Sequence, residues 1–427
     1  MILPEPKNDN QDPSGSLSAT VRDLTQNVVR AWRECENKRP PLVRTFTPRQ
    51  RAPREKAMAR FIDSVRTEAK HPPHTRDEAG AVQKRILSGF EHLARTAFDW
   101  EDRHLQALLA SGFDRSALEF TRMARQFDPS VQPGDIFQGW RNVWVMNGLQ
   151  TLLGLPVRLT PAIFAYSLLY PYTDNVLDDP AATEDSKRVF NERLRRRLEG
   201  SDVAASNPHE KKVFDLVGLI EGQFDRARDS RVFDSLLAIH HSQVQSVRLL
   251  RASEAAADLD VLSIVLEKGG TSVLADGFLV AGSLTQAQAE FLFGLGSYLQ
   301  LIDDLEDVQG DAEAGLLTVF SQAAGRKPLD SLTDQAICFG VRMLDGLRSF
   351  SVPGSEPFQE VMKSSTIQAM VAVAGRAVRY YSRPYIKALE AFSPFRYAFF
   401  DKQRRKLFRR RVLLERLFEA FASVSLT

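Results

Sequence analysis

From about residue 75 onward, apolar residues recur at intervals of three and four positions, with almost none of the strict alternation that a half-buried strand requires. This periodicity is that of one face of an α-helix, and it predicts an all-α fold. Three segments, 160–173, 260–281 and 286–302, are apolar on more than one face, which is typical of helices buried inside a bundle. We therefore expect a single large helical bundle in which these segments surround a central apolar cavity or core.

Proline, glycine and capping residues mark where these helices begin and end. Expected starts are Pro133, Pro161 and the Asp185-Ser186 pair, and expected ends or breaks are Gly154, Gly200, Gly282 and Gly310. These signals predict about a dozen helices. Neither an internal repeat nor a strong break in composition divides residues 75–395, so we expect one main domain over that range.

Segments of different composition flank this domain. Residues 1–16 are rich in Pro, Asn, Asp and Ser and predict a disordered N-terminal arm. Residues 17–74 predict a helical extension that contains a loop, marked by Pro40, Pro41, Pro48 and Pro53 with a basic cluster at Arg49, Arg51 and Arg54. Residues 396–427 predict a basic amphipathic C-terminal helix.

Charge and cysteine content exclude several classes of protein. The 56 Lys and Arg nearly balance the 54 Asp and Glu, so a net charge of +2 offers no overall field to nucleic acid. Cys35 and Cys338 are the only cysteines and cannot build a disulfide framework, which suits a reducing compartment. We see no signal peptide, and apolar runs such as 163–170 are far shorter than the ~20 residues that span a bilayer. We expect a cytoplasmic protein that neither spans a membrane nor binds nucleic acid.

An acidic cluster ends the apolar run at 163–170. Asp174 and Asp178 are four residues apart, so on a continuous helix they lie one turn from each other and point the same way. Two like charges at that spacing repel each other. Either the cluster is a solvated helix end, or it holds a cation.

A second acidic cluster ends the apolar helix expected from about residue 287. Asp303, Asp307 and Asp311 follow one another at four-residue spacing, with Asp304 and Glu306 beside them and no Lys or Arg between. Mg²⁺ takes only oxygen ligands and is usually held by one or two carboxylates together with substrate phosphates. Two facing acidic helix ends therefore favour a magnesium–diphosphate site over an exposed acidic helix end.

The ordered pair of motifs resembles those of the class I isoprenoid synthases, the superfamily of terpene and prenyl synthases. The segment from Asp174 to Asp178 resembles their first aspartate-rich motif in its DxxxD form. The segment from Gln300 to Asp307 resembles the second motif of the prenyltransferases, and its continuation to Asp311 is similar to the metal triad of terpene cyclases. The resemblance covers residues 135–395 and implies a helical bundle with both motifs at the mouth of a hydrophobic cavity.

The resemblance also implies the roles of individual residues. Three Mg²⁺ ions would bind with the substrate diphosphate at Asp174, Asp178, Asp303, Asp304, Asp307 and Asp311, and Asp174, Asp178, Asp303 and Asp307 would be catalytic. Lys268, followed by Gly269 and Gly270 in an apolar segment, resembles the helix break that faces the diphosphate in this family. Arg379 and Tyr380 resemble the late Arg-Tyr pair that grips diphosphate, with Arg376, Arg383 and the Arg396-Tyr397 pair as competitors. Arg248 and Arg251 could sense the diphosphate, although their spacing to Asp303 departs from the usual cyclase pattern.

Other candidate residues carry weaker signals. Trp140, Trp144, Phe164 and Tyr170 are the aromatic residues nearest the first motif that could line a cavity, or they could simply be core. The seven histidines, including His240 and His241, lack the spacing of zinc ligands, so we expect packed or exposed histidines.

The reaction type depends on what the chain lacks. The Gly-Lys-Arg segment and the Arg pair that bind isopentenyl diphosphate in chain-elongating enzymes are missing, as is the tyrosine-rich segment of head-to-head synthases. We therefore expect a terpene synthase, similar to the bacterial large-terpene synthases, that ionises a prenyl diphosphate and yields a cyclic or rearranged terpene. The alternatives are a prenyltransferase, either of the squalene or phytoene type or chain-elongating, and a non-catalytic helical lipid-binding protein.

In the C-terminal segment 399–421, apolar residues are interleaved with the basic residues Lys402, Arg404, Arg405, Lys406, Arg409, Arg410 and Arg411. Its apolar side could pack on the core while its charges are solvated. Alternatively it could attach the protein peripherally to anionic membrane, with each basic residue near the surface contributing ~1 kcal/mol. A homodimer is also compatible with the sequence.

Overall fold

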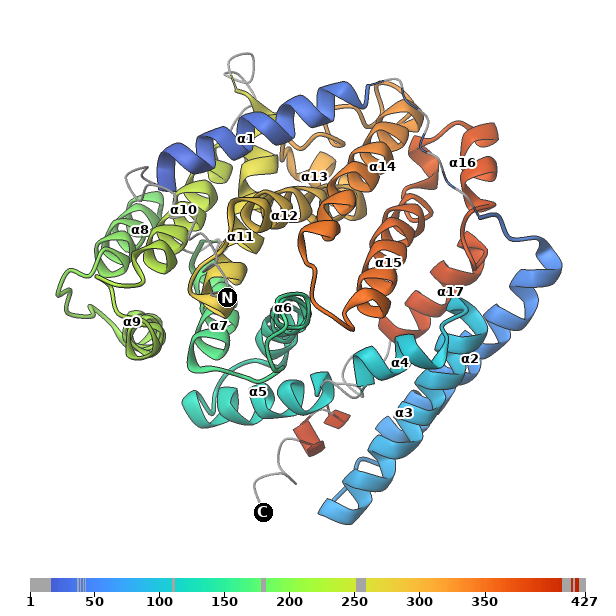
Figure 1. Ribbon diagram of the computed structural model, residues 1–427, viewed down its shortest axis with the longest axis horizontal. Coiled ribbons are helices and arrows are strands. Elements are labelled where there is room, and N and C mark those ends of the chain that lie inside the picture. Colours follow the sequence, from blue (N-terminus) through green and yellow to red (C-terminus); the bar gives the residue numbers. More distant parts are fainter. Residues whose placement is uncertain are drawn as a thin grey trace, which may run out of the picture.

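The computed structural model describes residues 17–36, 38, 40, 42, 44–109, 112–177, 182–250, 259–408, 416–417 and 419–421. Within these ranges the chain forms helices joined by turns, and no strand occurs there (Figure 1). The prediction of an all-α fold is confirmed. The arm predicted at residues 1–16 lies outside the described residues.

In the first half of the chain, the described residues form ten α-helices and one short 3₁₀ segment. They are α1 (Leu17–Glu34), α2 (Pro48–Lys70), α3 (Arg76–Phe98), α4 (Asp102–Leu109), α5 (Phe113–Phe127), α6 (Pro133–Leu152), α7 (Pro161–Leu177), α8 (Glu184–Leu198), α9 (Pro208–Gln223), α10 (Ser230–Ser246) and η1 (Val247–Leu250).

The second half contains two long helices that are largely buried, α11 (Val261–Ala281) and α12 (Gln286–Glu306). It also forms α13 (Val308–Ala314), α14 (Asp330–Leu344), η3 (Asp345–Ser349), α15 (Glu356–Ala374), η4 (Val378–Tyr380), α16 (Arg383–Glu390) and α17 (Tyr397–Phe408). The described helices outnumber the predicted dozen because α4, α13 and α16 have only 7 or 8 residues, too few for a clear periodicity.

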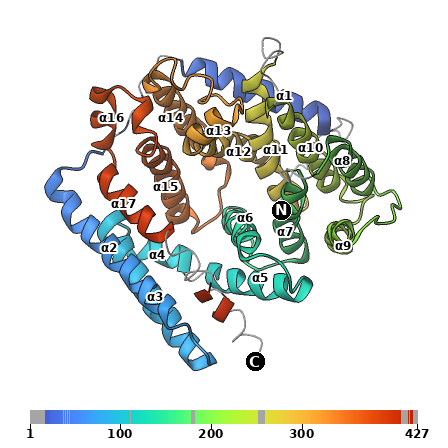
Figure 2. The same cartoon turned by 180° about the vertical axis from the view of Figure 1, so that it is seen from behind.

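Helices α11 and α12 form the centre of the bundle. They pack against each other and are surrounded by α6, α7, α10, α14 and α15, while α1 crosses their outer side (Figures 1 and 2). The hairpin of α2 and α3 lies at one edge of the molecule, and α8 and α9 lie at the opposite edge. The segments predicted to be buried, 160–173, 260–281 and 286–302, correspond to α7, α11 and α12.

Glycines allow α11 and α12 to approach unusually closely. A Cβ atom on Gly296 would lie 2.1 Å from the carbonyl oxygen of Gly269, and one on Gly269 would lie 2.4 Å from the carbonyl oxygen of Gly296. Any other residue at either position would push the helices apart. The prediction that Gly269 and Gly270 break the helix is wrong: α11 runs through both without interruption, and these glycines serve helix packing instead.

The prediction of a loop between Pro40 and Pro53 is wrong from Pro48 onward, where the chain is helical. Helix α2 begins at Pro48, where a missing N–H costs nothing, and Thr47 caps it through a reciprocal capping box with Gln50. Pro53 is accommodated inside the helix, near its N-terminal end. Arg51 and Arg54 are buried rather than part of a basic surface.

Most of the predicted helix boundaries are confirmed. Pro133 and Pro161 begin α6 and α7, and α8 begins at Glu184 beside the predicted Asp185-Ser186 pair. Gly154, Gly200 and Gly282 follow α6, α8 and α11 with positive φ angles of 69°, 91° and 76°, a conformation that favours glycine. Gly310 instead lies inside α13, because the helical segment is interrupted three residues earlier, at Asp307.

The described helices were also compared with the length and apolarity that a membrane span requires, and none reaches both.

Candidate active site between two acidic helix ends

A cavity of about 780 Å³ lies between α6, α7, α11, α12, α15 and α17. This volume is within the range of sites that enclose a small organic molecule. Much of its wall is apolar, and the apolar side chains come from five of the helices: Val145, Val273, Leu299, Ile302, Ala369, Ala372, Val373 and Phe400. Charged and hydroxyl groups gather on the remaining wall, so the cavity has both an apolar part and a polar part.

The acidic end of α12 supplies carboxylates to this cavity. Asp303 lines it, and one of its oxygens lies 3.9 Å from the Arg141 guanidinium of α6. The surrounding protein desolvates Asp303 and raises its pKa, Asp307 raises it further, and Arg141 and Lys268 oppose the shift. Asp303 is therefore a carboxylate whose charge is only partly neutralised by the protein.

Asp304 faces the interior rather than the cavity. It is 5% exposed, one carboxylate oxygen accepts a 2.8 Å hydrogen bond from Gln300 Nε2, and Oδ2 has no hydrogen-bond donor among the described residues. Burial is the main cause that raises its pKa to about 7. A buried carboxylate oxygen without a donor is costly, which makes this position one that a cation would stabilise.

The three acids predicted at four-residue spacing do not lie on one uninterrupted helix. Helix α12 ends at Glu306, Asp307 is the residue between the helices, and Asp311 lies in α13. The backbone N–H of Asp307 still bonds to Asp303 O and that of Asp311 to Asp307 O, both at 2.9 Å, so the turn-by-turn stacking persists. The pKa of Asp311 is raised to about 6 by burial and by Asp307.

Lys268 of α11 is the predicted cation that lies nearest these acids. Its charge lowers the pKa values of Asp303, Asp304 and Asp311, which places it within electrostatic reach of all three. Lys268 is not part of the cavity wall, whereas its neighbour Gly269 is.

The first acidic motif reaches the same cavity through Tyr170 and Gln138. Asp174 of α7 accepts a 3.3 Å hydrogen bond from Gln138 Nε2 of α6, and both Gln138 and Tyr170 line the cavity. The pKa of the Tyr170 phenol is raised by burial, then by the charges of Asp174 and Asp303. Tyr170 therefore lies within reach of both acidic motifs. Asp178, the second acid of the first motif, lies outside the described residues.

Arg376, which the sequence offered only as a competitor, lies on the cavity wall. It forms an ion pair with Glu306, the last residue of α12, which also lines the cavity. Burial and the nearby Arg404 of α17 lower the pKa of Arg376. The guanidinium groups of Arg376 and Arg404 thus both line the cavity, and that of Arg376 contacts a carboxylate at the end of α12.

Arg379 and Tyr380, the favoured pair, lie in η4 outside the cavity wall. Arg379 donates a hydrogen bond to the Tyr380 hydroxyl, stacks over its ring and lies 3.8 Å from Glu313 of α13. Arg248 bonds to Gln245, and Arg251 lies outside the described residues. The diphosphate-binding roles predicted for these residues stay predictions.

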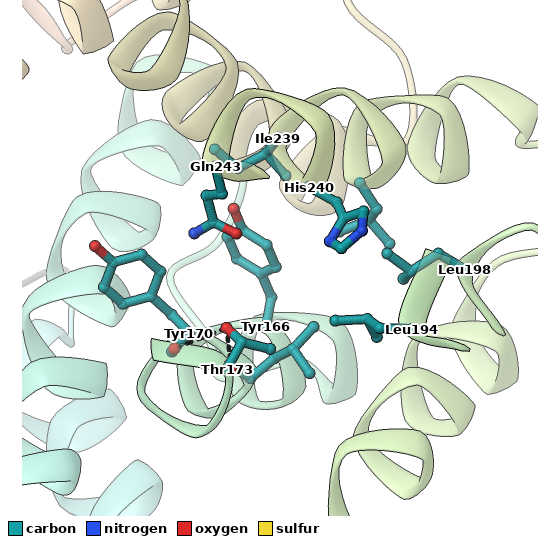
Figure 3. A pocket seen from close by; sticks show the side chains of 10 residues that line it. Tyr166, Tyr170, Thr173, Leu194, Leu198, Ile239, His240 and Gln243 are labelled. Carbon is teal, nitrogen blue, oxygen red and sulfur yellow. Dashed lines mark hydrogen bonds between the residues drawn. The ribbon is translucent and has the colours of Figure 1, made fainter. Parts of the chain in front are cut away.

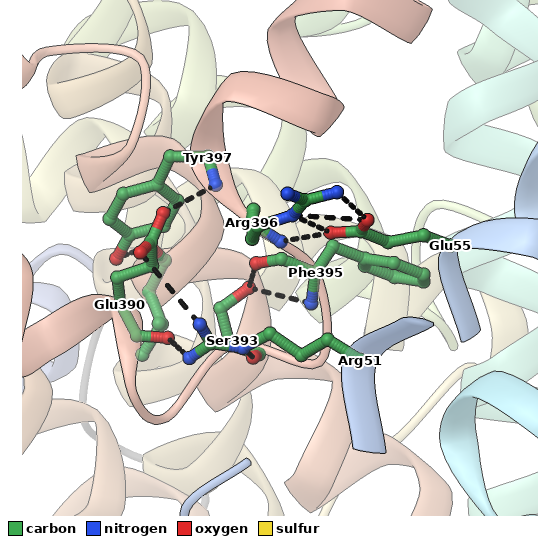
Figure 4. A network of polar contacts seen from close by, with 8 residues as sticks. Arg51, Glu55, Glu390, Ser393, Phe395, Arg396 and Tyr397 are labelled. Atoms are coloured by element: carbon green, nitrogen blue, oxygen red, sulfur yellow. Dashed lines mark hydrogen bonds and ion pairs between the residues drawn. The ribbon is translucent and has the colours of Figure 1, made fainter. Parts of the chain in front are cut away.

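The third competitor, Arg396-Tyr397, has a structural role (Figure 4). The Arg396 side chain and backbone donate to Glu55 of α2, while Tyr397 Oη donates to the carbonyl of Val371 at 2.9 Å. On the other side, Arg51 of α2 donates to the carbonyl of Ser393 at 3.1 Å. These bonds fasten the start of α17 to α2 and α15, so that Phe400 and Arg404 of α17 complete the cavity wall.

A carboxyl group that sequence reasoning did not select lies in the cavity wall. Asp276 of α11 is 1% exposed, lines the cavity and accepts a 3.3 Å hydrogen bond from Asn142 Nδ2. Burial raises its pKa well above the usual range. The tyrosine beside it, Tyr166, also lines the cavity, and its pKa is raised by burial and by Asp276. The available signal was an acid in the largely apolar stretch 269–281.

The remaining aromatic candidates divide between wall and core. Tyr170 lines the cavity, whereas Phe164 is 1% exposed and packs against Phe120 in the core. Trp144 lies on the exposed side of α6 at 43% exposure, and Trp140 packs against it. Neither tryptophan is part of the cavity wall.

A second, much smaller cavity of about 30 Å³ lies between α7, α8 and α10 (Figure 3). Tyr166 and Tyr170 border both cavities, and His240 and Gln243 of α10 border the small one. Burial lowers the pKa of His240 to about 4, so its imidazole is neutral at pH 7. The volume suits water and not an organic substrate.

Across the part of the chain that the structure describes, His, Cys, Asp and Glu side chains do not assemble in groups of three or more that could hold a metal ion. The chain was also compared with protein-family models, curated proteins and solved structures, and none of these matches it.

Proposed function

We propose that this protein is a Mg²⁺-dependent terpene synthase of the class I type, which binds a prenyl diphosphate in the 780 Å³ cavity, ionises it and releases diphosphate. The observation that carries the proposal is the environment of Tyr170. This tyrosine lines the cavity on α7 and responds to the charges of both Asp174 on its own helix and Asp303 on α12. Two acidic helix ends, 129 residues apart as 303 minus 174, therefore serve one cavity.

The donor atoms fit magnesium. Asp303, Asp304 and Asp311 have raised pKa values because their carboxylates are desolvated, and the free oxygen of Asp304 has no donor in the described ranges. Mg²⁺ prefers carboxylate oxygens and completes its shell with water and phosphate, so a full set of protein ligands is not required. Asp303 with Asp307, and Asp174 of the first motif, would each contribute one or two carboxylates to an ion, and diphosphate oxygens and water would complete its shell. When bound, magnesium stabilises negative charge on the departing diphosphate.

Basic residues on the cavity wall can bind the diphosphate itself. Arg141, Arg376 and Arg404 line the cavity, and guanidinium groups bind phosphate oxygens in a bidentate manner. Arg376 already pairs with Glu306, so it lies beside the carboxylates that would hold the metal. The substrate's charged end would therefore lie between α12, α6 and α17.

The apolar wall suits the hydrocarbon end of the substrate. Valine, leucine, isoleucine and alanine side chains from α6, α11, α12 and α15 exclude water there, which protects an allylic cation from immediate quenching. The rings of Tyr166 and Tyr170 border this space and present π-electrons that stabilise a cation. In its ionised form, the Asp276 carboxylate, which accepts a hydrogen bond from Asn142, is a group in this wall to which a proton could be transferred.

The proposal is tested by incubating the purified chain with Mg²⁺ and geranyl, farnesyl or geranylgeranyl diphosphate, with and without isopentenyl diphosphate. Released pyrophosphate is measured, and extracts are separated by gas chromatography with mass detection. We expect pyrophosphate and a hydrocarbon or alcohol product without isopentenyl diphosphate, and loss of both with a chelator.

The other outcomes each reject the proposal. A longer prenyl diphosphate formed only with isopentenyl diphosphate would identify a chain-elongating prenyltransferase. Joining of two prenyl chains would identify a head-to-head synthase. Binding of the diphosphates without any turnover would identify a non-catalytic lipid-binding protein.

A further inference from the structure

The only two cysteines of the chain meet in the structure. Cys35 directly follows α1, and Cys338 lies in α14, 303 residues later. Their Sγ atoms are 2.9 Å apart, and both are free thiols. Cys35 is 2% exposed, whereas Cys338 is partly exposed.

The surrounding contacts hold this pair in place. Gln335 Nε2 donates a 3.0 Å hydrogen bond to the carbonyl of Trp32, and the Trp32 ring packs edge-on against Phe339 with ring centres 5.8 Å apart. One turn further along α14, Arg342 forms an ion pair with Glu34. These contacts lie on both sides of Cys338 on one face of α14, so they keep α1 docked on α14 beside the two sulfur atoms.

We propose that Cys35 and Cys338 are a redox modification site, where a disulfide forms under oxidising conditions and fastens α1 to α14. The co-reactant is a low-molecular-weight disulfide. The Cys338 thiolate attacks one sulfur of that reagent, forms a mixed disulfide and releases the other half as a thiol. The Cys35 thiolate then attacks the Cys338 sulfur and displaces the second half. The two protein thiols are oxidised, and the reagent disulfide is reduced to two thiols.

The order of the two steps follows from exposure. Cys338 is the thiol that the reagent can reach, and Cys35 is the buried resolving thiol already beside it. Burial and the neighbouring Cys338 raise the pKa of Cys35 to about 12, so few molecules carry the thiolate at neutral pH. We therefore expect the closing step to be slow at neutral pH and faster as the pH rises.

The disulfide would hold α1 more firmly against the buried helices that it covers. Helix α1 packs on α10, α11, α12 and α14, and Thr25 Oγ1 of α1 donates a 3.2 Å hydrogen bond to Glu267 of α11. Glu267 directly precedes Lys268, whose charge lowers the pKa values of the α12 carboxylates Asp303 and Asp304. Fastening α1 therefore also stabilises the helix that carries Lys268. The proposal does not depend on the enzymatic function.

The test begins with the full-length reduced protein, which is incubated with glutathione disulfide and then alkylated in denaturant. Intact mass and peptide mapping count the remaining thiols and identify linked peptides. We expect both thiols to disappear, with a mass loss of two hydrogen atoms and a Cys35–Cys338 linked peptide. Because the loop closed is long, we expect the melting temperature to rise by about 3 °C, reversibly with dithiothreitol.

Variants separate the disulfide from other effects of the oxidant. Cys338→Ala and Cys35→Ala should each show no change in melting temperature on oxidation, and Cys35→Ala should retain a glutathione adduct on Cys338. For the wild-type chain, two thiols that stay free, stable separate glutathione adducts, or a disulfide between two molecules would each overturn the proposal. The mass measurement on the wild-type chain decides it even where a variant does not fold.

Discussion

Buried acids on the two sides of α7 differ in whether a cation neutralises them, and their pKa values shift in opposite directions. On the side of α8 and α9, Glu210 is 1% exposed, yet the ion pair with Arg193 and the hydrogen bonds of Ser206 outweigh its burial and lower its pKa to about 2. Asp128, bound by Lys212 and Ser130, likewise has a pKa lowered in spite of burial. On the side of α11 and α12, burial raises the pKa values of Asp276 and Asp304 because cations do not neutralise them fully.

This difference separates structural from functional charges. A buried carboxylate that is paired stabilises the fold at neutral pH, whereas one left without a cation costs free energy. Asp276 and Asp304 are of the second kind, and the more exposed Asp303 and Asp311 also have raised pKa values; substrate and metal at the cavity could supply the missing charge. The following predictions test this division, beginning with the largest expected effect.

Asp303→Asn should reduce turnover at least about 100-fold, because the carboxylate that faces the cavity would no longer hold a cation at the departing diphosphate. The free energy of unfolding should not fall, since removing one charge from an acidic cluster relieves repulsion. The measurements are pyrophosphate release and urea denaturation. The matched control is Glu290→Gln at the exposed opposite end of α12, which should leave both unchanged. Near-normal turnover in Asp303→Asn would reject its metal-binding role.

Glu210→Gln should reduce stability and leave turnover unchanged, the reverse of Asp303→Asn. The free energy of unfolding should fall by about 2 kcal/mol, because Arg193 loses its charged partner and Ser206 a strong acceptor. Since the pKa of Glu210 is lowered to about 2, this stabilisation is present above the ordinary glutamate pKa and is lost in acid. Turnover well below the melting temperature should stay unchanged. The control Glu192→Gln, in an exposed pair with Arg195, should not change stability measurably.

Arg376→Gln should raise the KM for prenyl diphosphate about tenfold, because this guanidinium lies on the cavity wall beside Glu306. Arg379→Gln, which alters the residue that sequence reasoning favoured, should change the KM less than about twofold. Steady-state kinetics on both variants compares the two positions directly. A larger effect at Arg379 would indicate that η4 closes onto the cavity when substrate binds.

Asp276→Asn and Asp128→Asn should change stability in opposite directions. The pKa of Asp276 is raised in the folded state, so the wild-type chain loses stability as the pH rises above the unfolded value of about 4. Asp276→Asn removes this loss and should be the more stable chain at pH 8 by at least about 1 kcal/mol, with little difference at pH 4. Asp128→Asn should be less stable at pH 8, because the pKa of Asp128 is lowered. Urea denaturation at both pH values measures this, and equal behaviour of the two variants would contradict the division.

Local features of the sequence were sufficient for the helices and for the position of the acidic motifs. The periodicity of apolar residues predicted α7, α11 and α12, and proline and glycine predicted the ends of α6 and α8, because these signals depend on neighbours within a few residues. The same reasoning placed Asp174 and Asp303 at the ends of apolar helices. The magnesium site, the terpene synthase activity, the domain limits and the membrane contact of the C-terminal helix stay predictions.

Only the tertiary structure decided which side chains meet. Gly269 was expected to break α11 but instead allows α12 to approach, and Arg376 rather than Arg379 faces the cavity. Asp276 joins the cavity wall, and Cys35 reaches Cys338 across 303 residues. The reason is physical: a helix's existence follows from local propensity and pattern, whereas its rotation, depth and partners follow from packing between segments distant in the chain.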